Sequence, residues 1–76
     1  MSANTDARRL LLLSAARLYS LGVDLEGARE DVRRLAASPG TPGLREAAAA
    51  FLELREQWRA AEAEHLRLRD ELAGEK

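Results

Sequence analysis

The amino-acid sequence predicts an all-α protein, a coiled-coil-like antiparallel hairpin of two helices that dimerises into a four-helix bundle. Apolar residues recur at alternating spacings of three and four, and one cluster of proline and glycine lies at the centre of the 76-residue chain. A lone hairpin of this size buries too little apolar surface to offset its chain entropy, so further cover is expected. Residues 1–76 are predicted to form a single helical-hairpin domain, with helices at about 5–37 and 42–73 and a turn at 38–43.

The first helix is predicted by an unbroken heptad pattern of small and apolar residues. Its a and d positions are Leu11, Ser14, Leu18, Leu21, Leu25, Ala28, Val32 and Leu35. Gly22 and Gly27 each cost about 1 kcal/mol relative to Ala inside a helix, so a stop near Asp24 is an alternative. Because the heptad phase is the same on both sides of the glycines, we expect one continuous helix with a local bend.

The central turn contains two prolines and two glycines within residues 38–43. Pro39 disfavours the α conformation at the residue before it, and Gly40 can adopt a positive φ. Thr41 is predicted as the N-cap of the second helix, with Pro42 as its first residue. A connection this short makes the two helices antiparallel neighbours.

The second helix repeats the heptad rule. Its seam positions are Leu44, Ala47, Phe51, Leu54, Trp58, Ala61, His65, Leu68 and Leu72. Pairing Leu35 with Leu44 across the turn, and stepping outward along both helices, places large residues opposite small ones at several layers. The same register brings Ser14 opposite His65, so the two polar residues of the seam are predicted to meet each other.

Composition excludes several classes of function. Twelve Lys and Arg balance thirteen Asp and Glu, for a net charge of −1, so no basic face for nucleic acid is expected. The absence of cysteine excludes disulfides, thiolate zinc sites and thiol catalysis. The four leucines at 10–13 are soon followed by Arg17, which is atypical of a signal peptide or membrane span. We expect a cytoplasmic protein that neither binds nucleic acid nor inserts into a membrane.

Apolar residues outside the seam form the candidate interaction face. Leu12, Ala16, Tyr19 and Val23 share one side of the first helix at helical spacing. The full candidate set is Leu10, Leu12, Leu13, Ala16, Tyr19, Val23, Leu52 and Leu66. Two interpretations are open: the face completes a homodimeric four-helix bundle, or it binds a different helical protein.

Few residues could support catalysis or hold a cofactor. Glu62 and His65 form a Glu-x-x-His pair of the kind used in di-metal bundles, but the seam of the first helix offers no further glutamate. Ser14 has no base and orienting group arranged as a catalytic triad requires. We therefore predict no enzyme activity, catalytic residue, metal ligand or cofactor, and a structural role for His65. The predicted function is protein–protein interaction.

Part of the chain resembles the hairpin of sporulation-type aspartyl-phosphate phosphatases. The similar segments are Leu25-Glu26-Gly27-Ala28-Arg29, then Val32 and Leu35, and Phe51-Leu52-Glu53-Leu54-Arg55 with Trp58. Of that family's Ser-Gln-x-Leu-Asp signature, residues 51–55 retain the leucine. The resemblance implies an alternative function, in which the hairpin regulates a response regulator by promoting loss of its phosphoryl group.

The central segment has a second resemblance. Residues 35–44, which contain Pro39 and Pro42 in a Pro-x-x-Pro turn, are similar to the turn of type III secretion needle subunits, which are also helical hairpins. This resemblance implies a further alternative, a secretion-apparatus subunit or its small chaperone.

Overall fold

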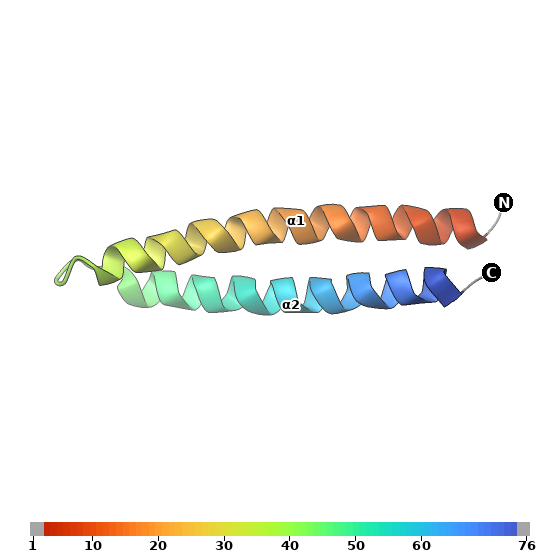
Figure 1. The fold of residues 1–76 in the computed structure, drawn as a ribbon. Helices are drawn as coiled ribbons and strands as arrows, with labels where there is room; N and C mark the ends of the chain where they lie inside the picture. The colour runs from red at the N-terminus through yellow and green to blue at the C-terminus, as the bar shows by residue number, and fades with distance from the viewer. Residues whose placement is uncertain (1–2, 75–76) are drawn as a thin grey trace.

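The computed structural model describes residues 3–74 and consists of two long helices joined by a short turn (Figure 1). Helix α1 spans Ala3–Ala36 and helix α2 spans Leu44–Gly74. The helices lie side by side and antiparallel, with the turn at one end and both termini at the other. The predicted hairpin is confirmed.

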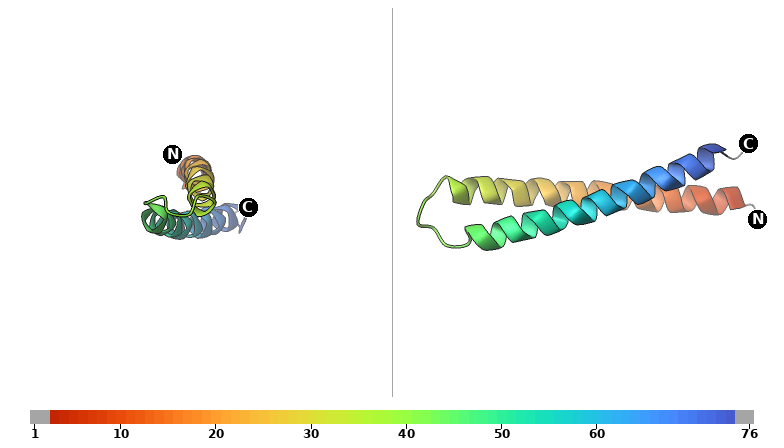
Figure 2. Two further views of the ribbon diagram at one scale, coloured as in Figure 1. Left: turned by 90° about the vertical axis from the view of Figure 1, so that its left-hand side faces the viewer. Right: turned by 90° about the horizontal axis from the view of Figure 1, so that it is seen from below.

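Helix α1 passes through Gly22 and Gly27 without interruption. The ribbon of α1 curves gently along its length and shows no sharp local bend of the kind that we expected at the glycines (Figure 1). Seen from a perpendicular direction, α2 crosses α1 at a shallow angle instead of running parallel to it (Figure 2). Helices with a heptad seam wrap around each other in this way, because the seam must keep facing its partner. The result is a thin rod with extents of 59 × 14 × 13 Å.

The chain reverses through a tight turn directly after α1. The amide of Thr41 donates a hydrogen bond to the carbonyl of Ser38 at 3.2 Å, so Pro39 and Gly40 are the central turn residues. Gly40 has a φ of 90°, which is the left-handed value that a type II turn requires at its third residue. The positive φ predicted at this glycine is therefore present.

The start of α2 differs from the prediction at Thr41 and Pro42. Gly43, not Thr41, occupies the N-cap position, because its carbonyl accepts the first helical hydrogen bond from Ala47 at 2.9 Å. Gly43 has a φ of 106°, a conformation that a right-handed helix cannot contain. The helix can therefore begin only at Leu44, two residues after the predicted position.

The predicted seam is the contact between the two helices. The a and d residues of α1 from Leu11 to Leu35, and those of α2 from Ala47 to Leu72, are all buried or partly buried. Among residues 5–74, Ala61 and Leu68 are the two most buried, at 8% and 9% exposed. Leu44 is the exception, at 39% exposed, because it lies at the turn where the seam ends.

Charged side chains stabilise the two helices from outside the seam. Exposed ion pairs at helical spacing join Arg29 to Glu26, Arg33 to Glu30, Arg34 to Asp31, and Arg67 to both Glu64 and Glu71. Hydrogen bonding with Glu64 is the main cause that raises the pKa of the Arg67 guanidinium above its ordinary value. Such exposed pairs are screened by solvent and contribute little to stability, so the fold depends on the apolar seam.

Candidate interaction surface

The hairpin exposes more surface than a compact protein of its mass. Its accessible area is 5880 Å², whereas a compact monomer of 8.4 kDa would expose about 4,600 Å². Among residues 5–74, no large side chain is fully buried. Two helices in a single layer have no second layer to cover their outer faces, so apolar side chains outside the seam remain in contact with water.

These exposed apolar side chains coincide with the candidate face. The large hydrophobic residues that the structure exposes are Leu10, Leu12, Leu13, Tyr19, Val23, Leu44, Leu52 and Leu66. Tyr19 is 76% exposed and Leu12 is 72% exposed, and Ala16 is also exposed. Leu44 was predicted as a seam residue from its heptad position. Because Leu44 is the first residue of α2, its place beside the turn could have indicated that it is exposed.

The structure divides the candidate face between two flanks of the hairpin, because the docked α2 separates residues that are neighbours along α1. Leu10 and Leu13 line a groove of about 310 Å³, which we call the Leu13 groove. Its other lining residues are Ser14, Arg17, Ala60, Ala61, Glu64 and Leu68. Arg17 and Glu64 thus place both signs of charge in this groove, although Glu64 pairs with Arg67 and not with Arg17.

The second groove lies on the opposite flank and is larger, at about 560 Å³. We call it the Tyr19 groove. Its lining residues are Ala15, Leu18, Tyr19, Gly22, Val23, Glu26, Trp58 and His65. A methyl group added at Gly22 would lie 3.6 Å from Nε1 of Trp58, so the indole is exposed to the groove at the point where Gly22 has no side chain.

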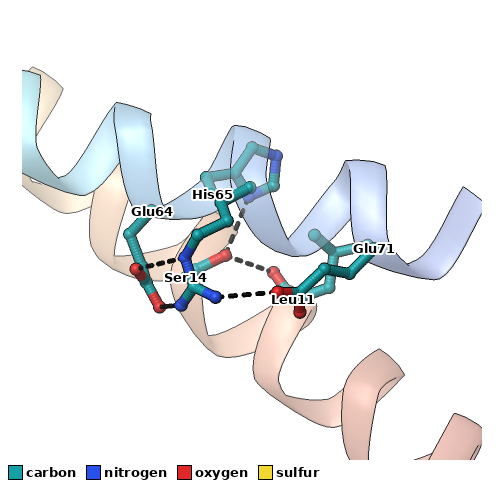
Figure 3. Close-up of polar contacts among 6 residues, drawn as sticks. Leu11, Ser14, Glu64, His65 and Glu71 are labelled. Atoms are coloured by element: carbon teal, nitrogen blue, oxygen red, sulfur yellow. Dashed lines mark hydrogen bonds and ion pairs between the residues drawn. The ribbon is translucent and has the colours of Figure 1, made fainter.

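A polar layer crosses the seam beside this groove. Oγ of Ser14 lies 2.8 Å from Nδ1 of His65 and 2.9 Å from the carbonyl oxygen of Leu11 (Figure 3). A serine hydroxyl has one proton, and the Leu11 carbonyl can only accept. Both contacts are satisfied when Ser14 donates to Leu11 and Nδ1 of His65 donates to Ser14. Nε2 of His65, on the other side of the ring, points away from Ser14 (Figure 3).

The described residues offer no cluster for metal chemistry. Within residues 3–74, no three His, Cys, Asp or Glu side chains gather closely enough to hold a metal ion. Neither α1 nor α2, over the same residues, has an apolar stretch of the length and hydrophobicity that a bilayer crossing requires. The feature that stands out chemically is therefore the exposed apolar surface.

Comparison with protein families, with curated proteins and with solved structures finds no match to this chain. Its function must therefore be inferred from its own residues. Among the positions that carry the resemblance to the phosphatase hairpins, Leu54 lies in the seam, while Leu52 and Arg55 are exposed.

Proposed function

We propose that this chain is a non-catalytic association module that forms a homodimer through the Tyr19 flank of α1. The observation that carries this proposal is the apolar stripe of Leu12, Ala16, Tyr19 and Val23, which is exposed along the same helix that borders the larger groove. A monomer would keep this stripe in water, where it has no stabilising role.

The Tyr19 flank is a better docking surface than the Leu13 flank for two reasons. Its groove is larger and is lined by two aromatic side chains, which supply much of the binding energy in protein interfaces. The Leu13 groove contains two charged residues, Arg17 and Glu64, whereas the Tyr19 groove contains one, Glu26. Burying charges beneath a partner costs desolvation energy, so that cost is larger on the Leu13 flank. A second hairpin covering the Tyr19 flank would add the second layer that the fold lacks.

Sedimentation equilibrium of purified protein tests the proposal. Wild-type protein should be a dimer at micromolar concentration, and the Leu12→Glu/Tyr19→Glu variant should be monomeric, because buried carboxylates at the contact would cost several kcal/mol. The matched control is Leu10→Glu/Leu13→Glu, which changes two exposed residues on the other flank and should remain dimeric. A wild-type monomer would refute the homodimer, and a monomeric control would shift the interface to the Leu13 flank.

A further inference from the structure

The outer face of α1 carries charged residues at both ends of its apolar stripe. Arg9 precedes Leu12 by three residues, and Glu26 follows Val23 by three. The extended set, which we call the outer stripe, is Arg9, Leu12, Ala16, Tyr19, Val23 and Glu26. All six side chains are exposed. In chain order these residues are basic, apolar, small, large, apolar and acidic. When a second copy runs antiparallel to the first, basic therefore faces acidic, small faces large, and apolar faces apolar.

We propose that two copies dock their outer stripes antiparallel, with Leu12 of each copy inserted into the Tyr19 groove of the other and Arg9 beside the partner's Glu26. This inference rests on the proposed homodimer and specifies its geometry. The two-fold axis of this dimer lies between residues 17 and 18. It pairs position 9 of one copy with position 26 of the other, position 12 with position 23, and position 16 with position 19. Small Ala16 then faces large Tyr19, and Leu12 faces Val23.

The Tyr19 groove has the shape for a leucine at that position. Gly22 contributes no side chain, and the small Ala15 lies one turn before Leu18 and Tyr19 on the same flank. The indole of Trp58 also lines this groove, and its Nε1 would lie 3.6 Å from a methyl group added at Gly22. Since Leu12 is 72% exposed, its insertion would remove a large apolar area from water at both symmetric sites.

Charge complementarity favours this register over the one that lies one heptad closer to the turn. Glu26 accepts a hydrogen bond from Arg29 through Oε1 at 3.4 Å, and its side chain is 74% exposed. A carboxylate can accept several hydrogen bonds, so a second guanidinium can bind there. Sliding the copies by one heptad toward the turn would instead place Arg9 beside Arg33. The same shift would place the apolar side chain of Leu12 beside the carboxylate of Glu30.

Charge reversal tests the register. Arg9→Glu alone and Glu26→Arg alone each place like charges together at two symmetric sites, and each should raise the dimer dissociation constant about tenfold or more. An equimolar mixture of the two single variants should restore dimerisation, because both cross-chain pairs regain opposite charges. Native mass spectrometry distinguishes this heterodimer by its mass. Glu53→Arg, an exposed reversal on α2, is the control and should leave the dissociation constant unchanged.

Cysteine crosslinking gives an independent readout, since the native chain has no cysteine. Leu12→Cys protein mixed with Val23→Cys protein should form a disulfide-linked heterodimer under mild oxidation. Each variant has a single cysteine, so any disulfide that forms must join two copies. Leu10→Cys mixed with Val23→Cys is the control and should stay uncrosslinked.

The outcomes separate this register from the proposed function. A wild-type dimer in which mixing restores nothing and positions 12 and 23 do not crosslink would overturn the register and leave the homodimer intact. A wild-type monomer at micromolar concentration would overturn both. Restoration by mixing, together with crosslinking at positions 12 and 23, would support both.

Discussion

Nδ1 of His65 lies 2.8 Å from Oγ of Ser14 across the seam, and the two residues form a polar layer within an otherwise apolar contact. Slipping the helices by one heptad would place Ser14 opposite Trp58 in one direction or Leu72 in the other. His65 would then face Ala7 or Leu21, and both polar groups would lose their partner. A polar layer of this kind specifies register, as a polar residue at an a position does in coiled coils.

Ser14→Ala should therefore destabilise the hairpin by about 1 kcal/mol, because it leaves Nδ1 of His65 without its partner in a partly buried position. Ser14→Ala/His65→Leu should recover much of this loss, since an apolar pair leaves no polar group unsatisfied. Urea unfolding at one fixed protein concentration measures both changes. Ser20→Ala, at an exposed serine on the same helix, is the control. A Ser14→Ala effect no larger than that of the control would contradict a stabilising role for the hydrogen bond.

The turn glycines should resist substitution for a backbone reason. Gly40 and Gly43 have φ values of 90° and 106°, which an L residue adopts only with strain, so alanine at either should cost about 1 kcal/mol. Neither cost comes from crowding: an added methyl group meets nothing within 4 Å at Gly40 and only Leu35 at 3.9 Å at Gly43. Gly74→Ala, at the end of α2, should have little effect. Thermal unfolding at matched concentration compares the three variants, and equal melting temperatures would argue against the turn geometry.

The seam was predictable because burial in a two-helix contact recurs with the heptad, and the sequence keeps that phase from Leu11 to Leu72. The start of α2 was not predictable in the same way. Thr41 and Pro42 have the better local propensity for a helix start, but the positive φ of Gly43 depends on how the whole turn closes. Propensity at two residues therefore placed the boundary two positions too early.

The division of the candidate face into two flanks also depends on tertiary structure. Leu10, Leu12 and Leu13 are close neighbours on an isolated helix, so their spacing alone predicts one surface. Once α2 docks along the seam, Leu10 and Leu13 line one groove. Leu12 lies on the other flank by its heptad position, in the same stripe as Tyr19. The apolar residues were identifiable from the pattern, but their separation required the position of the second helix.

The two glycines inside α1 provide the last prediction, because they lie on opposite flanks. An added methyl group at Gly27 meets nothing within 4 Å, so Gly27→Ala should stabilise the helix by about 1 kcal/mol and leave the dimer dissociation constant unchanged. Gly22→Ala should gain the same helical propensity, and its methyl group would make only ordinary contact with Trp58 at 3.6 Å. That methyl group, however, would occupy the Tyr19 groove, where Leu12 of the second copy is proposed to dock.

Gly22→Ala should therefore weaken the dimer while leaving each hairpin folded, whereas Gly27→Ala should strengthen the fold alone. Circular dichroism checks that both variants keep their helical content, and sedimentation equilibrium gives the two dissociation constants. The comparison is matched, since both changes replace glycine by alanine in the interior of α1, five residues apart. Identical dissociation constants for the two variants would show that Gly22 is outside the interface, and a stronger Gly22→Ala dimer would show that the groove has room that no partner side chain fills.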